Sequence, residues 1–145
     1  MTIGRSDIER LIPHAGAMCL LDGVIRWDDA SIVCVSGRHR DPDNPLRNRG
    51  RLGVLSGVEF AAQAMAAHGR LAGGVRARPR TGYMVSLRDV VCGCERLDLV
   101  TGNLIVEAER VMGDDDRATY RFVVRGDARD LLSGRATVVL DVIPS

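Results

Sequence analysis

The sequence predicts one domain of the α+β class, spanning residues 1–145, in which an antiparallel sheet of six strands is rolled around a single long helix. Three observations lead to this prediction. With 145 residues, 46% of them hydrophobic, the chain can bury one core and is too short for two comfortable domains. One alanine-rich segment has helical length and apolar residues on nearly every side, and six segments have strand composition. Such a helix needs to be enclosed, and the sheet is the only other large element.

The first third of the chain predicts a short helix followed by a hairpin. Residues 5–12 (RSDIERLI) offer a polar cap and apolar side chains at helical spacing, and Pro13 should end this helix. The apolar run 17–27 is typical of a strand, and 31–40 is its returning partner across a DDAS turn. Residues 41–53 contain two prolines, two asparagines and two glycines, which excludes regular structure.

The long helix is predicted from Val54 to Ala72. This segment has no proline, no threonine and at least five alanines, which favours a helix over a strand. Its apolar residues cover much of the helical circumference, so we expect it to be buried within the core and not to lie on its surface. Gly73 and Gly74 should stop it.

The second half of the chain predicts four strands with one wet face. In the segment 117–125, apolar and charged residues alternate, as Tyr120 and Phe122 alternate with Arg121. Such alternation is typical of a half-buried antiparallel strand. The four segments are 82–94, 103–112, 117–125 and 131–143.

Composition excludes several classes of function. The formal net charge of +1 gives no case for nucleic-acid binding. No signal-peptide core or run of eighteen apolar residues occurs, so we expect a cytoplasmic protein without a membrane span. The four cysteines lack C-x-x-C spacing, and we expect buried thiols in preference to a metal or disulfide site. They are Cys19, Cys34, Cys92 and Cys94.

All basic residues are arginines, and several of them cluster. Solvated loops are one interpretation of the clusters; the other is a docking surface for an acidic partner or a phosphate-bearing ligand, because guanidinium groups suit carboxylate and phosphate. The two clusters are Arg38, Arg40, Arg47, Arg49 and Arg51, then Arg76, Arg78 and Arg80.

Glu59 is the residue that most needs an explanation. It stands near the start of the apolar segment GVEFAAQAMAAH (57–68), and an ionised carboxylate is costly to bury unless it is paired. Gln63 follows four residues later, about 40° away around the helix, which favours an acid held in orientation by an amide. The alternative is a carboxylate that only stabilises the helix N-terminus. His68 lies roughly 180° from Glu59, so we expect it to serve packing or a dimer contact.

Three motifs carry a resemblance to a known family. The segment LIPHAGAMCLLDGV (11–24) resembles that family's Leu-Pro-His opening and the strand after it, and GVEFAAQAMAAH (57–68) resembles its central helix with the acidic residue. The segment TGYMVSLRDVVCGCERLDLVTGNL (81–104) resembles the strand at its dimer-facing edge. The chain thus resembles the hot-dog-fold (3R)-hydroxyacyl-ACP dehydratases of the FabA/FabZ-like group, and within it the branch linked to aryl polyene lipid synthesis.

The resemblance implies a reaction and an assembly. The reaction is removal of water from a 3-hydroxyacyl group on acyl carrier protein, giving the trans-2-enoyl thioester in fatty acid, polyketide or aryl polyene synthesis, with no metal or redox cofactor. The assembly is a homodimer whose sheets join edge to edge, with acyl tunnels at the subunit interface. Two alternatives remain open: a non-catalytic acyl-binding or partner subunit, and an acyl thioesterase.

The resemblance also implies site residues. Glu59 matches the catalytic acid, Gln63 the amide beside it, and Gly57 with Val58 the backbone near the helix start, where free amides can bind a carbonyl oxygen. The family's catalytic histidine lies in a Pro-Gly-His loop about fourteen residues before the acid, where this chain has NPLRNRGRLG and no histidine.

Two histidines are candidates to replace the missing one. His14, from the Pro-His motif, is the first, although a role as a helix C-cap is its alternative. His39 is the second, although we expect it at the surface. A loss of the chemistry is the third possibility.

Overall fold

The computed structural model describes residues 3–12, 16–73, 80–114 and 116–142, and for residues 80–82 and 140–142 it describes the backbone alone. Its strands are β1 (Ile3–Gly4), β2 (Gly23–Trp27), β3 (Ser31–Ser36), β4 (Arg80–Cys92), β5 (Leu104–Gly113), β6 (Arg117–Gly126) and β7 (Arg129–Val142). Its α-helices are α1 (Arg5–Leu11) and α2 (Gly57–Ala72), with short 3-10 helices at Gly16–Met18, Arg38–Arg40 and Val54–Ser56.

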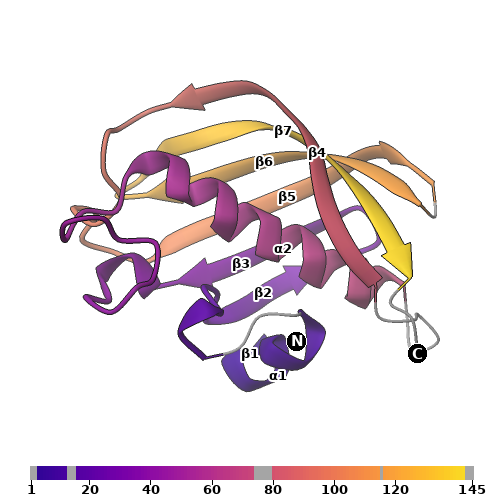
Figure 1. Ribbon diagram of the computed structural model, residues 1–145, viewed down its shortest axis with the longest axis horizontal. Coiled ribbons are helices and arrows are strands. Elements are labelled where there is room, and N and C mark those ends of the chain that lie inside the picture. Colours follow the sequence, from indigo (N-terminus) through magenta and orange to yellow (C-terminus); the bar gives the residue numbers. More distant parts are fainter. Residues whose placement is uncertain (1–2, 13–15, 74–79, 115, 143–145) are drawn as a thin grey trace.

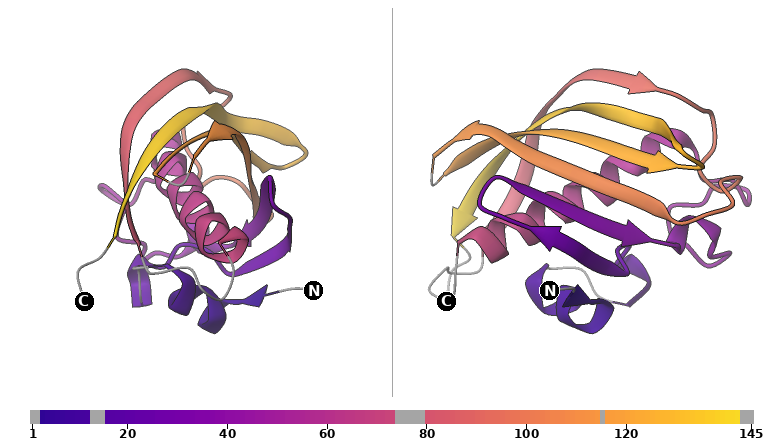
Figure 2. Two further views of the ribbon diagram at one scale, coloured as in Figure 1. Left: turned by 90° about the vertical axis from the view of Figure 1, so that its right-hand side faces the viewer. Right: turned by 180° about the vertical axis from the view of Figure 1, so that it is seen from behind.

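The strands form one antiparallel sheet in the order β1-β2-β3-β5-β6-β7-β4 (Figure 1). This sheet curls around α2, as both views of Figure 2 show. The α+β hot-dog arrangement expected from the sequence is confirmed. The described sheet has seven strands and not six, because the two-residue strand β1 pairs with β2 at one edge.

The predicted strand 17–27 is shorter than expected, since only Gly23–Trp27 is extended in the sheet. The residues before it are held by a side chain of α2 and not by a strand: the Leu20 amide donates to Gln63. The returning strand β3 ends at Ser36, whose hydroxyl accepts a hydrogen bond from the Arg38 amide and starts the 3-10 turn there. Residues 41–53 are irregular, as predicted.

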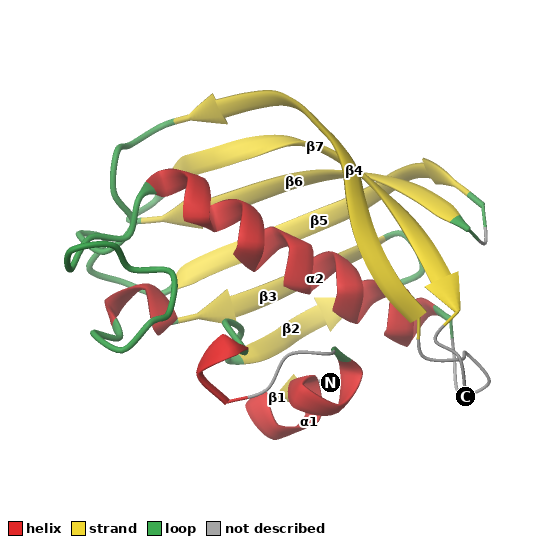
Figure 3. Cartoon of the chain, in the orientation of Figure 1, coloured by secondary structure: helices red, strands yellow, loops and turns green. Residues whose placement is uncertain are grey.

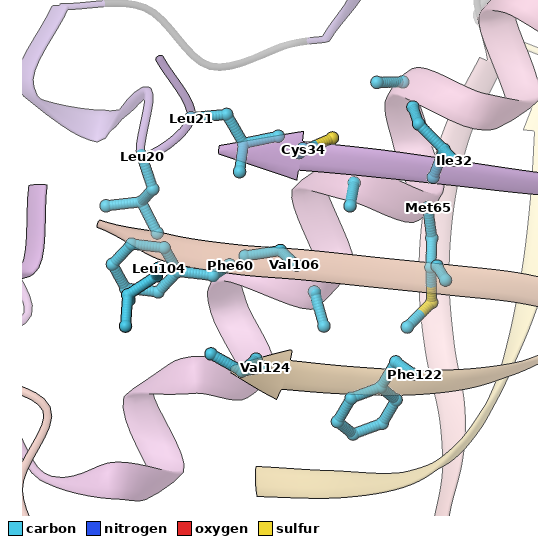
Figure 4. Packing of buried hydrophobic residues seen from close by; sticks show 14 of the residues in the cluster. Leu20, Leu21, Ile32, Cys34, Phe60, Met65, Leu104, Val106, Phe122 and Val124 are labelled. Carbon is cyan, nitrogen blue, oxygen red and sulfur yellow. The ribbon is translucent and has the colours of Figure 1, made fainter. Parts of the chain in front are cut away.

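The core lies between α2 and the inner face of the sheet (Figure 4). On β5, Leu104, Val106 and Ala108 are buried while Glu109 on the opposite face is exposed, which confirms the predicted alternation. Small residues of α2 let its backbone approach the strands, and each fully buried large side chain such as Phe122 contributes about 1.5–3 kcal/mol.

The described sheet wraps α2 as expected, but the described residues leave one strip of the helix uncovered. Leu55, Glu59 and Gly69 are exposed along this strip, and Ala62 and Ala66 are half-buried. These positions follow one another at intervals of three or four residues, so they form one continuous helical face. The sheet wraps the rest of the helix and leaves this face open.

Strand β4 is an uncovered edge of the sheet, because it pairs with β7 alone. Three of its apolar side chains, Tyr83, Val85 and Val91, are each more than half exposed. A long apolar edge is a template for pairing with another chain. The described part of the chain therefore has an open strip on its helix and an open edge on its sheet.

The cysteines divide into two pairs. Cys19 and Cys34 are buried as predicted, and burial raises the pKa of the Cys34 thiol to about 12. For the other pair the prediction is wrong, since Cys92 is exposed and Cys94 half-buried, because they lie at and just after the end of the uncovered strand β4. Within the described ranges, no cluster of three or more metal-ligating side chains occurs, and no helix is long and apolar enough to cross a membrane.

Candidate functional site

Glu59 lies in the first turn of α2, on the uncovered strip, and its side chain is exposed. Its carboxylate has neither a hydrogen bond nor an ion pair with any described residue. The structure directs this acid to the helical face that the described sheet leaves open. Because it is unpaired and accessible, this carboxylate is free to exchange a proton with a bound molecule.

A helix-capping role does not account for Glu59. In a capping box, the carboxylate at this position would accept a hydrogen bond from the amide of Ser56, three residues earlier. Here a 3-10 turn, Val54–Ser56, runs directly into α2, and the Ser56 amide donates to the Gly53 carbonyl at 3.1 Å. Of the interpretation that Glu59 only stabilises the helix, there remains the general preference for a negative charge near a helix N-terminus.

Gln63 does not orient Glu59, so the predicted pairing is wrong. Gln63 is buried, its Oε1 accepts the Leu20 amide at 2.8 Å, and its Nε2 donates to the Met18 carbonyl at 2.7 Å. Both hydrogen-bonding ends of the amide are therefore used by a segment more than forty residues away in the chain. Gln63 therefore fastens the stretch 18–20 to α2.

Gly57 and Val58 begin α2 close against the sheet. A Cβ atom at Gly57 would lie 2.8 Å from Leu132 Cδ2, so glycine allows the helix to start near β7. The amide of Gly57 donates to the Val54 carbonyl, because the 3-10 turn continues the helix backward. Gly57 therefore lacks the free amide that the sequence suggested, and Val58 is half-buried against the core.

Of the two histidine candidates for the missing imidazole, His14 lies outside the described residues. His39 was expected at the surface and is instead fully buried, with Nε2 3.0 Å from the Val100 carbonyl oxygen. Its Nδ1 has no partner among the described residues, and desolvation lowers the pKa of its imidazole. Because it is enclosed and hydrogen-bonded inside the fold, His39 is a structural residue.

His68 is also buried, which confirms the prediction of a packing role. Its Nδ1 is 2.7 Å from the Tyr120 hydroxyl and its Nε2 2.9 Å from the Asp28 carbonyl oxygen. The two rings meet edge to face with centroids 5.5 Å apart. His68 thus ties the second half of α2 to β6 and to the β2–β3 turn.

Three arginines of the first cluster are occupied within the fold. Arg38 pairs with Asp22 at 3.0 Å, and Arg40 donates to Asn103 at 2.9 Å. Arg47 donates to three backbone carbonyls of the surrounding loop, those of His39, Asp41 and Gly50. These guanidinium groups hold the 37–53 region in shape and are not free to bind a partner.

Arg49 and Arg51 differ from these three, because both are exposed and neither side chain contacts a described partner. They lie on a tight hairpin closed by reciprocal hydrogen bonds between Asn48 and Arg51. Arg49 and Gly50 both have positive φ, 54° and 76°, as a type I′ turn requires. The cluster Arg76, Arg78 and Arg80 lies outside the side chains that the structure describes.

The hairpin stands at the end of the molecule where α2 begins (Figure 3). Gly53 bridges to Arg96, and the Leu52 amide donates to Asp98 at 3.0 Å, so the chain that leaves the hairpin is fixed to the β4–β5 loop. Arg96 also pairs with Asp98 and lowers the pKa of that carboxyl to about 2. Two free guanidinium groups therefore stand on a well-braced turn that leads into the helix carrying Glu59.

A hollow of about 550 Å³ lies on the outer face of the sheet, where ion pairs such as Arg125 with Glu107 line it, and it does not include Glu59. The Glu59 carboxylate stands instead on the strip of α2 that the described residues leave exposed.

Comparisons with known proteins bear on the whole chain. A family model described as "ApeP-like: ApeP dehydratase" matches residues 6–141. No curated protein matches. The dehydratase heterocomplex ApeI:P from Xenorhabdus doucetiae superposes with a TM-score of 0.82 at 21% identity, over 92% of this chain and 90% of that one.

Other solved structures share the fold at lower identity. AziG of S. sahachiroi has a TM-score of 0.65 at 17% identity, over 92% of this chain and 100% of its own. A hypothetical thioesterase with coenzyme A from Streptococcus pneumoniae TIGR4 has a TM-score of 0.61 at 11% identity, over 98% and 100%. At such identities these likenesses show the fold alone.

Proposed function

This chain belongs to the ApeP-like dehydratase family, and on that premise we propose that it removes water from a 3-hydroxyacyl thioester to give the trans-2-enoyl thioester. The observation that carries the role of Glu59 is its unpaired, exposed carboxylate in the first turn of α2. An acid in such a position can protonate a leaving hydroxyl within hydrogen-bond reach.

In the proposed reaction, a base takes the proton from C2 of the acyl chain and Glu59, as a carboxylic acid, gives a proton to the C3 hydroxyl. The C3–O bond breaks, water leaves, and the electron pair of the C2–H bond becomes the double bond. Two of the three histidines in the chain are buried and hydrogen-bonded, so His14 is the imidazole that we propose as the base.

We propose that two copies of the chain join through β4. The exposed apolar side chains of that edge and the open strip of α2 would both be covered in such a dimer, and the region of Glu59 would become enclosed. A double substitution, Val85→Lys with Leu87→Lys, should convert the dimer to monomers in light scattering. Met112→Lys, at an exposed apolar position on β5, is the control. Persistence of the dimer in the double variant would count against this edge.

A partner subunit is the second candidate function, and two observations favour it. The described part of the chain has no accessible imidazole near Glu59, and the dehydratase of known structure quoted above is a heterocomplex. In that case β4 would pair with a different hot-dog chain that supplies the missing base. The purified protein alone would then be inactive with every acyl group.

We further propose that the substrate is carried by acyl carrier protein and that Arg49 and Arg51 contact it. Both guanidinium groups are unpaired, and their rigid turn leads into α2. Reversing both to Glu should weaken binding to an acidic carrier protein, most strongly at low salt. The control is Arg26→Glu with Arg117→Glu, the same charge change at exposed positions away from this turn and from β4. Equal affinities of the two double variants would refute the contact.

The experiment that tests the function is intact-mass spectrometry of a short 3-hydroxyacyl carrier protein incubated with the purified chain. Loss of one water with the wild type and not with Glu59→Gln or His14→Ala would support the dehydratase and both roles. Loss with His14→Ala would remove His14 from the mechanism. Release of free acid and thiol would mean a thioesterase, and no change despite a folded protein would favour the partner subunit.

A further inference from the structure

Ser56 is a second polar residue at the start of α2 whose side chain makes no hydrogen bond to a described residue. With Glu59 it forms the sequence Ser-x-x-Glu, which ordinarily marks a capping box, where the serine hydroxyl accepts an amide hydrogen three residues on. In this structure Ser56 has helical dihedral angles, φ −61° and ψ −20°, and makes no side-chain cap. The reason is the 3-10 turn Val54–Ser56, which places Ser56 inside a continuous helical path.

Neither half of the capping box is therefore formed. The Ser56 hydroxyl has no hydrogen-bond partner among the described residues, and the Glu59 carboxylate has none either. Residues three apart on a helix have Cβ atoms about 5–6 Å from each other, so the two groups are neighbours. Ser56 is half-buried and Glu59 exposed, beside the fully buried Gly57.

Helix stability does not account for a serine at this position. Serine has a lower helix propensity than alanine, and without a cap hydrogen bond nothing local offsets that difference. The hydroxyl offers one donor and two acceptor sites. The 3-hydroxyl group of a bound acyl chain needs a hydrogen-bond acceptor for its own hydrogen while a neighbouring acid protonates its oxygen.

We propose that Ser56 binds the 3-hydroxyl group of the substrate beside Glu59, accepting the hydrogen of that hydroxyl while Glu59 protonates its oxygen. This inference rests on the proposed dehydration. Ser56 then selects 3-hydroxyacyl chains over saturated ones, because a saturated chain leaves the serine without its partner. A neutral hydrogen bond of this kind corresponds to a preference of about threefold to tenfold.

The test measures binding and not turnover, so that a failure of this inference can be distinguished from a failure of the proposed reaction. The probes are pantetheine thioesters of 3-hydroxybutyrate and 3-hydroxyoctanoate with their saturated counterparts, and the proteins are Glu59→Gln and Glu59→Gln with Ser56→Ala. Ser56→Ala should weaken binding of the 3-hydroxyacyl probes about threefold to tenfold and leave the saturated probes unchanged. Ser56→Thr, which keeps the hydroxyl, should retain the preference, and Ser133→Ala on β7 is the control.

Thermal unfolding separates this role from a structural one. The melting temperature of Ser56→Ala should equal or slightly exceed that of the wild type, whereas loss of a working N-cap would lower it by several degrees. An unchanged preference for the 3-hydroxyacyl probes after Ser56→Ala would overturn the inference. So would a failure of those probes to bind the Glu59→Gln protein that retains Ser56, or a lowered melting temperature of Ser56→Ala with the preference intact. Absence of turnover in the wild type would instead refute the dehydration.

Discussion

Replacing Gln63 by Met should destabilise the protein much more than any change at Glu59, although the two residues are one helical turn apart. Methionine keeps the length and volume of the side chain and removes both hydrogen-bonding ends. The Leu20 amide is then left buried without a partner, and the Met18 carbonyl loses its donor. A buried backbone group left unpaired costs about 1–3 kcal/mol, and a partly exposed one costs less.

The expected loss in the free energy of unfolding is therefore about 2–4 kcal/mol. For 145 residues the unfolding entropy near the midpoint is about 0.3 kcal/mol/K, so a loss of 3 kcal/mol lowers the melting temperature by roughly 10 °C. Urea denaturation should show a lower midpoint at an unchanged slope, since the surface exposed on unfolding is the same.

Two further measurements make this prediction specific. Hydrogen exchange of the Leu20 amide should accelerate in Gln63→Met before the amides of β5 and β6 do, because the broken contact is local. Glu59→Gln, which removes a charge that has no partner in the described structure, should change the free energy of unfolding by less than about 0.5 kcal/mol. A loss below about 0.5 kcal/mol for Gln63→Met, or unchanged protection of Leu20, would refute the role of Gln63 as the fastening of residues 18–20.

Two other predictions concern stability. Burial lowers the folded-state pKa of His39 and His68 below the usual 6.5, so the unfolded chain binds more protons than the folded one as the pH falls. The stability that these two groups contribute is fully present above pH 6.5 and is lost as the pH is lowered. Urea midpoints at pH 7.5, 6.5 and 5.5 should therefore decrease in that order. A midpoint independent of pH over this range would show that neither imidazole is desolvated. A Cβ atom at Gly93 would overlap the Asp130 carbonyl oxygen, so Gly93→Ala should cost about 1–3 kcal/mol, whereas Gly53→Ala meets no atom within 4 Å and should cost much less. Equal urea midpoints for the two alanine variants would contradict this close approach.

The sequence by itself determined the secondary structure closely where a local pattern repeats. Alternation along 103–112 predicted β5, and the alanine-rich run from Val54 to Ala72 predicted a helix whose first three residues prove to be a 3-10 turn. These signals are local, because side-chain periodicity and turn residues act within a few positions of the chain. Together with the family motifs they also determined the fold and the position of Glu59 at the start of the central helix.

Tertiary structure alone decided what the polar side chains do. Spacing on the helix suggested that Gln63 serves Glu59, yet its partners come from residues more than forty positions earlier. His39 looked like a surface residue in a polar segment and is enclosed by the loop before β5, while a Ser-x-x-Glu pattern gives no cap because of the turn that precedes it. The physical reason is common to all three: a hydrogen bond goes to whichever group folding brings within about 3 Å, and chain topology decides that distance.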